Sequence, residues 1–277
     1  MKDTVELEKM ALTIRKDIDK MIHAARSGHP GGSLSMVEII TALFFEVLNK
    51  NPENPAWPKR DRFVLSKGHG VPALYSALAR AGYFPVEELM ELRELGSRLQ
   101  GHPDYSRLPA VEASTGSLGQ GLSIAAGIAL AARQRDMDYH TFCMVGDGES
   151  NEGQVWEAAM FASHHKLTNL TAIVDYNKFQ LDGPIEEIMA LEPFEEKWSS
   201  FSWKTNRIDG HNINEVLKAL KEAKTDEEQC HVIIADTVKG SGVSFMENDN
   251  NYHGVAPDDE ELEKALAELE AQEARLG

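Results

Sequence analysis

The sequence has 277 residues, of which 42% are hydrophobic and 26% are charged, values that argue against wholesale disorder. Its formal net charge of −17 would repel a polyphosphate backbone, which argues against a nucleic-acid partner. An anionic ligand would therefore have to be held by local groups, such as backbone amides, a few histidines or a metal ion.

Cysteine content and apolar patterning bear on the cellular location. Two cysteines, Cys143 and Cys230, are too few for a disulfide framework or a four-cysteine zinc site, which favours a reducing compartment. The first ten residues lack the apolar stretch of a secretory signal. No apolar run approaches the roughly 20 residues of a membrane span. We therefore expect a cytoplasmic protein with no membrane partner.

The predicted elements alternate between helices and strands. Apolar residues at helical spacing predict a helix over 4–25, which ends at the turn around Gly28, His29 and Pro30. Further helices are expected near 36–49, 72–81, 120–134, 153–163 and 213–223, and strands near 62–66, 141–145, 170–175 and 231–237. Residues 178–205 are expected to be rich in loops, with a short helix near 193–199. This alternation predicts an α/β fold with three α/β/α layers and a mostly parallel sheet.

The end of the sequence changes in composition. Residues 258–275 carry eight acidic residues against two basic ones, and Asp258 after Pro257 is a typical helix start. We therefore divide the chain into a domain over 1–257 and an acidic C-terminal helix over 258–277. Two interpretations of this helix stay open: a solvated terminal helix, or a helix that docks on a partner chain.

Several common motifs are absent from the sequence. It contains no P-loop, no G-x-G-x-x-G fingerprint, no H-E-x-x-H and no C-x-x-C. The segment that begins at Asp147 resembles the start of an EF-hand loop, but Glu152 stands where that loop needs glycine.

A candidate metal site follows two neighbouring strands. Asp147 lies between Gly146 and Gly148 directly after one predicted strand, and Asn177 follows the next strand along the chain. Ligands of open α/β sheets bind at the carboxyl ends of strands, where glycines let phosphate oxygens approach backbone amides. Carboxylate and amide oxygens suit Mg²⁺ or Ca²⁺ bound to a diphosphate. Asp147 taken alone is equally typical of an ordinary tight turn.

The histidines form a second signal. Five of the ten histidines are next to glycine, where the backbone leaves room for a ligand: His29, His69, His102, His211 and His253. A histidine that caps a turn is the simpler explanation for any one of them. Several of these turns nevertheless coincide with predicted ends of strands or helices.

Taken together, these segments resemble transketolase. The pair formed by Gly146-Asp147-Gly148 and Asn177 is similar to the thiamine diphosphate motif. The other similar segments are Ser27 to Pro30, Lys67 to Gly70, Gly101 to Pro103, Thr115 to Gly121 and Tyr252 to Gly254. The resemblance extends from about residue 10 to 257 and implies the thiamine diphosphate-binding fold.

The resemblance implies roles for particular residues. The Mg²⁺ or Ca²⁺ ligands would be Asp147, Asn177 and the backbone carbonyl of Phe179. The thiamine diphosphate would also contact His69, Gly148, Asn177 and His253, and its rings would contact Gly116, Ser117 and Leu118. Ser117 stands where many relatives have proline, which softens this turn.

The resemblance places three histidines in the substrate channel: His29, His102 and His253. Of these, His102 would donate a hydrogen bond to the C1 hydroxyl of the sugar donor. Glu152 is similar to an acid close to the subunit contact of the family.

The length departs from a complete transketolase, because only the first of its three domains is matched. The pyrimidine-binding domain is missing, together with the glutamate that activates the cofactor. The chain therefore resembles the N-terminal subunit of a split transketolase, active only with a C-terminal partner subunit, in an α2β2 assembly. Such an enzyme reversibly transfers a two-carbon ketol unit from a ketose phosphate to an aldose phosphate, as in the pentose phosphate pathway. The alternatives are a related subunit that acts on an unusual sugar, and a non-catalytic regulatory copy of the domain.

Overall fold

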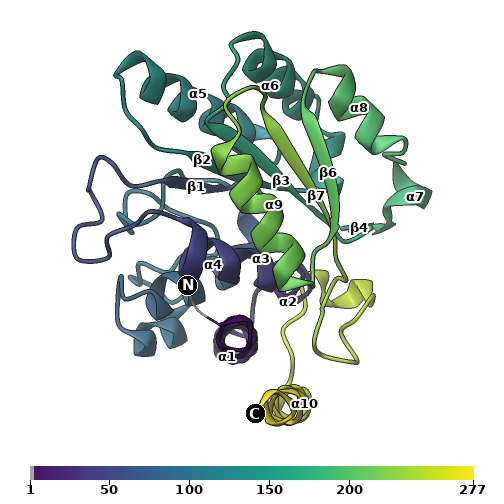
Figure 1. Ribbon diagram of the computed structural model, residues 1–277. Helices are drawn as coiled ribbons and strands as arrows, with labels where there is room; N and C mark the ends of the chain where they lie inside the picture. Colours follow the sequence, from purple (N-terminus) through teal and green to yellow (C-terminus); the bar gives the residue numbers. More distant parts are fainter. Residues whose placement is uncertain (1–2) are drawn as a thin grey trace.

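A parallel sheet of five strands forms the centre of the computed structural model, which describes residues 3–277 (Figure 1). Its strands, in spatial order, are β1 (Arg62–Leu65), β2 (Thr141–Gly146), β3 (Leu170–Tyr176), β7 (His231–Asp236) and β6 (Lys204–Asp209). Every neighbouring pair in this sheet is parallel, so the carboxyl ends of all strands lie along one edge. The predicted parallel sheet is confirmed.

Helices cover both faces of the sheet. One face is covered by α1 (Thr4–Ala25), α3 (Val37–Ala42), α4 (Val71–Arg80) and α9 (Ile213–Thr225), and the other by α5 (Gln120–Gln134), α6 (Gly153–His164) and α8 (Phe194–Ser200). Alternate strand residues serve the two layers: Met144 packs on the first, and Cys143 and Val145 on the second. The three-layer α/β/α prediction is confirmed.

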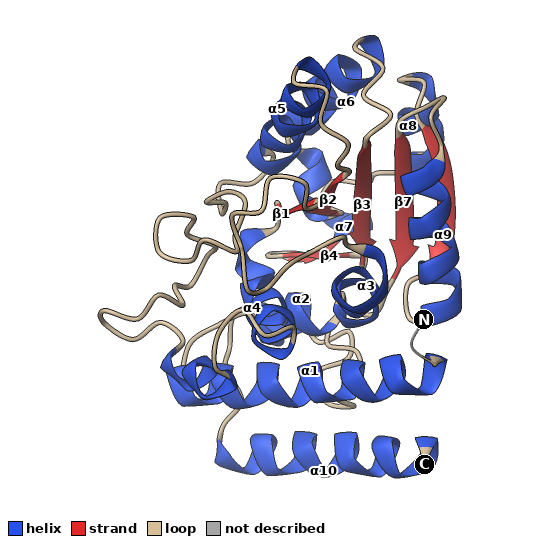
Figure 2. Cartoon of the chain, turned by 60° about the vertical axis from the view of Figure 1, so that its left-hand side comes forward, coloured by secondary structure: helices blue, strands red, loops and turns tan. Residues whose placement is uncertain are grey.

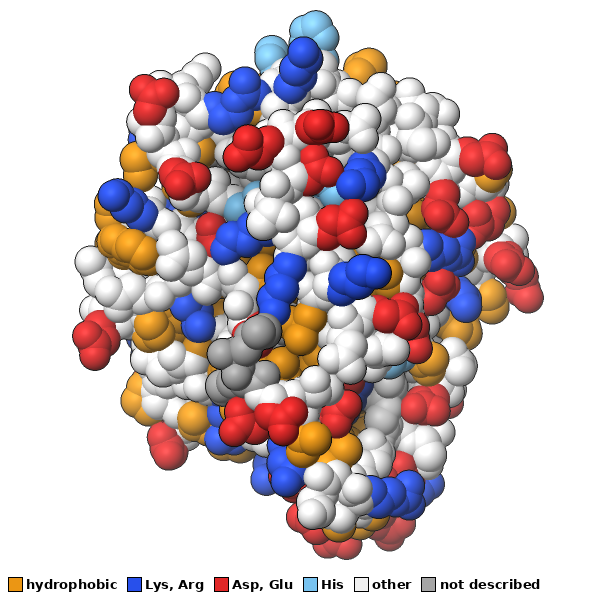
Figure 3. Space-filling view, in the orientation of Figure 1, with side chains coloured by type: hydrophobic (Ala, Val, Ile, Leu, Met, Phe, Trp, Pro, Cys, Tyr) orange, Lys and Arg blue, Asp and Glu red, His pale blue; other side chains and the backbone are white. Residues whose placement is uncertain are grey.

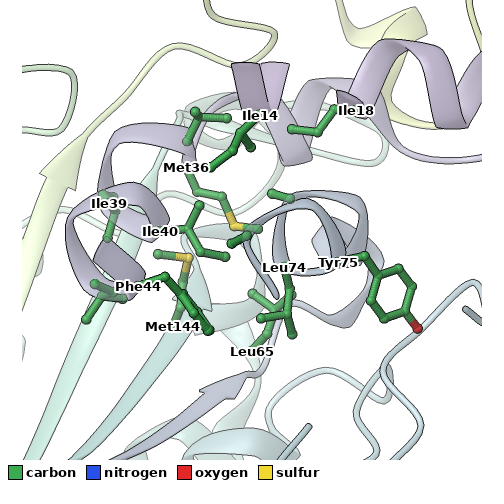
Figure 4. Close-up of a cluster of buried hydrophobic side chains, with 14 of the residues drawn as sticks. Ile14, Ile18, Met36, Ile39, Ile40, Phe44, Leu65, Leu74, Tyr75 and Met144 are labelled. Atoms are coloured by element: carbon green, nitrogen blue, oxygen red, sulfur yellow. The ribbon is translucent and has the colours of Figure 1, made fainter. Parts of the chain in front are cut away.

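The larger of the two cores packs α1, α3 and α4 against the sheet. Figure 4 shows Ile14 and Ile18 of α1 above Met36 and Ile40, with Met144 of β2 below them. These side chains are fully buried. Each contributes about 1.5–3 kcal/mol relative to an exposed position, so this core fixes the helices that carry the N-terminal turns.

Three segments differ from the prediction. Residues 204–209 form the edge strand β6, although we expected the loop-rich region to extend to 205 and no strand to follow it. Pro30–Leu34 forms the short helix α2, where we expected only a turn; its proline occupies the first helical turn, where no amide donor is needed. The predicted helix near 36–49 is α3 followed by a π-helical turn, η1 (Leu43–Val47).

The remaining elements are short. Two-residue strands β4 (Phe179–Gln180) and β5 (Gly183–Pro184) form a small antiparallel hairpin, followed by α7 (Ile185–Ile188). The 3-10 segments are η2 (Gly68–Gly70), η3 (Val86–Glu91), η4 (Gly148–Asn151) and η5 (Asn250–His253). Within residues 3–277, no helix combines the length and apolar character needed to cross a membrane.

The acidic tail forms helix α10 (Asp259–Leu276), which lies alongside α1 (Figure 2). Lys16 pairs with Glu273 at 2.6 Å and His23 with Asp259 at 2.8 Å, so the two helices run antiparallel. The predicted helix is present, begins with a capping box at Asp258, and exposes acidic side chains at the bottom of the molecule (Figure 3). Its treatment as a unit separate from 1–257 stays a prediction.

Candidate active site

A cavity of about 300 Å³ opens at the carboxyl ends of β2 and β3. Residues from seven separate parts of the chain line it: Gly32, the turn at Lys67 and His69, Leu118, the segment from Gly146 to Glu152, the segment from Asn177 to Asp182, Lys239 and His253. A larger groove of about 550 Å³ lies between α1 and α10. The smaller cavity is the candidate site, because the residues predicted to bind a ligand converge there.

Asp147 and Asn177 lie at the floor of this cavity. Both side chains are buried, at 2% and 6% exposure. The Asp147 carboxylate accepts hydrogen bonds from the amides of Gly148, at 2.7 Å, and of Lys178. Asn177 Oδ1 accepts from the Phe179 amide at 3.1 Å. The two predicted oxygen ligands therefore belong to one hydrogen-bonded turn.

A buried ion pair supports this turn from below. The Asp175 carboxylate accepts hydrogen bonds from Lys67 Nζ, from Ser35 Oγ at 2.6 Å and from Asn177 Nδ2 at 3.2 Å. Burial raises the pKa of Asp175, but the Lys67 ammonium and the hydrogen bonds from Lys67, Ser35 and Thr237 outweigh it and hold that pKa below its usual value. Asp175 is therefore charged and orients the Asn177 amide.

The donor set fits a hard divalent cation. Burial, followed by the neighbouring Asp175, raises the pKa of Asp147 to about 7, so its carboxylate lacks a compensating charge. Among residues 3–277, no three His, Cys, Asp or Glu side chains gather into a metal site. A metal ion here would therefore combine the Asp147 carboxylate with amide, carbonyl and ligand oxygens, as Mg²⁺ and Ca²⁺ do.

Four histidines cluster above this floor. The ring centroid of His29 lies 5.3 Å from that of His69, 5.5 Å from that of His253 and 6.4 Å from that of His102. The rings of His69 and His253 are stacked at 5.4 Å. The turns predicted separately from the sequence therefore meet at one place.

These imidazoles are neutral at physiological pH. Burial is the largest cause and lowers the pKa of both His29 and His253 to about 4, and that of His69 well below its usual value. Neighbouring cations lower them further: Arg93 and then Lys239 act on His29, Lys239 acts on His253, and Lys67 acts on His69. A neutral imidazole can donate one hydrogen bond and accept another, so the cluster can bind hydroxyl and carbonyl oxygens.

The glycine-rich segment packs tightly beside this cluster. Gly116 has φ 145°, and a Cβ there would lie 2.9 Å from His102 Cδ2, so a side chain would displace this imidazole. Leu118 is 37% exposed and lines the cavity, whereas the exposed Ser117 does not. The buried Glu149 accepts from the Gly119 amide at 2.8 Å and ties this segment to the end of β2.

Most predicted residues meet at the cavity. His69, Leu118, Asp147, Gly148, Glu152, Asn177, Phe179 and His253 line it, and His29 contacts His69 and His253. His102 is next to His29 and Gly116 is next to His102, but neither lines the cavity, and Glu152 is exposed. His211, also next to glycine, lies outside the cavity. It forms a hydrogen bond with Glu38 at 2.9 Å, so we assign it a structural role.

Two buried lysines were missed by the sequence analysis. Lys67 and Lys239 are each 1% exposed and line the cavity. Lys239 Nζ donates to His253 Nδ1 at 3.0 Å, and burial lowers the pKa of this lysine to about 8. Both lysines directly precede a glycine after a strand, at Gly68 and Gly240. A lysine before a glycine at the end of a strand was therefore the signal available in the sequence. The two lysines make the cavity attractive to anions despite the net charge of −17.

Comparisons with known proteins agree with this geometry. The family described as "Transketolase, thiamine diphosphate binding domain" matches residues 7–274. The chain is 46% identical to the 6-deoxy-6-sulfo-D-fructose transketolase subunit of Clostridium sp. (strain MSTE9), over 98% of both chains. It is 38% identical to an apulose-4-phosphate transketolase subunit of Phocaeicola vulgatus, over 98% of this chain and 96% of that one.

A solved structure matches equally well. The crystal structure of transketolase from Campylobacter jejuni superposes with a TM-score of 0.91 at 33% identity, and the match covers 100% of this chain. It covers 46% of the Campylobacter chain, so this chain spans about half the length of that transketolase.

Proposed function

The chain belongs to the transketolase family, as its thiamine diphosphate-binding domain, and from this premise we propose that it transfers a two-carbon ketol unit together with a partner subunit. The expected family, the thiamine diphosphate-binding fold and the assignment as a transferase are confirmed. The proposed reaction is reversible, from a ketose phosphate to an aldose phosphate.

One observation carries this proposal: Asp147 and Asn177, the proposed metal ligands, line the same cavity as His69 and His253, whose rings pack against His29. Thiamine diphosphate, when bound, supplies an electron sink for breaking the bond between C2 and C3 of a ketose. The protein must hold the charged end of that cofactor and orient the sugar. The residues around Asp147 are suited to the first task, and the histidines are suited to the second.

The cavity floor is proposed to hold the metal and the diphosphate. Asp147, the Asn177 side chain and the Phe179 carbonyl would bind Mg²⁺ or Ca²⁺. His69, His253 and the Gly148 amide would face the diphosphate oxygens, with Lys67 and Lys239 offsetting their negative charge. Gly116, Ser117 and Leu118 would contact the cofactor rings.

The sugar is proposed to enter over the histidines. His29, His102 and His253 come from three separate turns and present neutral imidazoles, which can donate to oxygens where charge develops. The resemblance to transketolase assigns His102 to the C1 hydroxyl of the donor, and its ring lies 6.4 Å from that of His29.

An apolar surface on α5 and α6 supports the proposal of a second subunit. Helices α5 and α6 pack side by side and expose Ile124, Met160 and Phe161, at 37%, 57% and 39%. Leu181, at the cavity rim, is 66% exposed. We propose that the C-terminal, pyrimidine-binding subunit covers this face in an α2β2 assembly, with Glu152 close to the contact. The proposed location is the cytoplasm.

A second candidate is transfer from an unusual sugar. The two relatives named above are transketolase subunits for 6-deoxy-6-sulfo-D-fructose and for apulose 4-phosphate, and both match this chain along nearly its whole length. These matches favour a dedicated sugar substrate as much as a general ketose phosphate. A non-catalytic copy is disfavoured, since Asp147, Asn177 and the histidines are all present.

The experiment is a donor panel. The chain would be co-purified with its C-terminal subunit, then supplied with thiamine diphosphate and Mg²⁺. Three donors would be compared at equal concentration with one aldose phosphate acceptor: xylulose 5-phosphate, 6-deoxy-6-sulfofructose and apulose 4-phosphate. The donor with the highest kcat/KM identifies the substrate class, and no transfer from any donor would refute the proposed ketol transfer.

A further inference from the structure

Arg93 lies on the loop after η3 and has no role in the function proposed above. Its backbone adopts φ 63°, a left-handed conformation that is uncommon for a bulky side chain. Its amide donates to the Leu99 carbonyl at 2.8 Å, which closes the loop over 93–99. The structure thus holds this residue in a costly conformation outside any helix or strand.

The Arg93 side chain joins two turns. Nη1 donates to Ser27 Oγ at 3.1 Å and Nη2 to the Gly101 carbonyl at 3.4 Å. Ser27 lies two residues before His29, and Gly101 directly precedes His102. The contact at Gly101 is close, because a Cβ there would lie 2.7 Å from Arg93 Cζ. One guanidinium therefore spans the turns that carry both histidines.

The orientation of His29 depends on such a support. Its Nδ1 is buried and, among the described residues, has no hydrogen-bond partner. The ring orientation must therefore come from the backbone of its own turn and from packing against neighbouring rings.

We propose that Arg93 is a positioning residue for the substrate channel: its guanidinium holds the turns of His29 and His102 at the separation at which both imidazoles reach one sugar. This inference rests on the proposed function for its choice of ligand. The bridge itself is a property of this chain alone, so it can be tested without a partner or turnover.

Arg93 has two separable actions. Its fork of donors fixes geometry, and its positive charge lowers the pKa of His29 and of His102, in each case after burial, which is the larger cause. The other charged or titratable groups that act on His29 are His102 and Lys239, and the rings of His69 and His253 pack against it. Arg93→Lys keeps the charge but cannot make both hydrogen bonds in one plane, whereas Arg93→Gln removes the charge.

The first test uses the full chain with isotope-labelled histidines, followed by NMR across a pH titration. We expect Arg93→Gln to shift the imidazole signals of His29 and His102 and to raise both pKa values. Arg93→Lys should shift the signals but leave the pKa values low. Arg98→Gln is the matched control, because Arg98 lies on the same loop and pairs with Glu88 at 2.8 Å. If Arg93→Gln leaves both histidines unchanged, the proposal is wrong.

The second test uses the complex of both subunits. We expect Arg93→Gln and Arg93→Lys to raise the donor KM by about tenfold, the scale of one or two lost hydrogen bonds, while cofactor affinity changes less than twofold. Normal KM in Arg93→Lys would contradict the positioning role, as would an equal loss of cofactor affinity. If the wild-type complex transfers no ketol unit, the proposed function fails and the NMR result alone decides on the bridge.

Discussion

Asn177 Nδ2 donates to the Asp175 carboxylate over 3.2 Å, which leaves Oδ1 at the other end of the amide, where it accepts from the Phe179 amide. Asp175 is fully buried, and the same oxygen of its carboxylate also accepts hydrogen bonds from Lys67 and Ser35. Supporting hydrogen bonds of this kind fix the orientation of groups that bind metal ions. The two proposed ligands are therefore arranged before any metal binds.

Asp147→Ala should remove cofactor binding without unfolding the chain. The variant deletes the one carboxylate among the proposed metal ligands, so the dissociation constant for thiamine diphosphate in the presence of Mg²⁺ should rise by about 100-fold or more. Calorimetric titration of the complex would measure it. Asp182→Ala, which removes an exposed carboxylate from the same cavity, is the control. Near-normal activity of Asp147→Ala at limiting cofactor would show that the metal assignment is wrong.

His102→Ala should lower the rate and spare the cofactor. We expect kcat to fall by about 10²–10³, the usual cost of losing one donor to developing charge, with an unchanged dissociation constant for thiamine diphosphate. Steady-state kinetics and calorimetry on the same preparation separate the two effects. A variant with weakened cofactor binding and a normal rate at saturation would place His102 on the cofactor.

The His29 imidazole should make folding sensitive to acid. Burial lowers its pKa in the folded chain to about 4, below its usual value near 6.5. The unfolded state therefore binds more protons between these values, and stability is lost as the pH falls from about 6.5 toward 4. Asp147 changes the stability in the opposite direction. Its pKa in the folded chain is raised to about 7, so its contribution to stability increases as the pH falls.

A comparison of the wild type with His29→Gln separates the contribution of His29 to this pH dependence from that of Asp147. In urea unfolding at pH 4.5, 5.5 and 6.5, the variant should lose less stability on acidification, with a slope smaller by up to about 1.4 kcal/mol per pH unit. Equal slopes in the two proteins would contradict the lowered pKa.

Two glycines of α5 give a matched test of packing. A Cβ at Gly121 would lie 2.4 Å from Ser66 Cβ, whereas at Gly127 nothing lies within 4 Å. Gly121→Ala should lower the free energy of unfolding by about 1–3 kcal/mol. Gly127→Ala should raise it by up to about 1 kcal/mol, because alanine favours the helix. Urea unfolding of the chain measures both, and similar values would refute the close contact between α5 and the end of β1.

Local signals predicted most of the fold. The helix over 120–134 was predicted with its observed bounds, and β2, β3 and β7 were placed to within about one residue, because buried parallel strands are continuous apolar runs. Strand β6 was missed because only Ile208 of its six residues is buried, so its edge position leaves no apolar pattern.

Local signals also predicted part of the candidate site and missed the rest. Asp147, Asn177 and the histidines next to glycine form recognisable local patterns, and the structure brings four of those five histidines together near Asp147 and Asn177. Lys67 was missed because its partner Asp175 is 108 residues away in sequence. Arg93 was missed because its bridge needs the loop over 93–99 to fold back on Ser27, which no spacing in the sequence indicates.

The central claim is that this chain holds half of an active site and needs a pyrimidine-binding partner. Without that partner, no residue assigned here activates the cofactor, and its reactive centre would be open to water. The most direct measurement is ketol transfer by the purified chain alone, at saturating thiamine diphosphate and Mg²⁺, beside the same amount of chain with the co-expressed C-terminal subunit. The account predicts turnover only in the mixture, and robust turnover by the chain alone would contradict it.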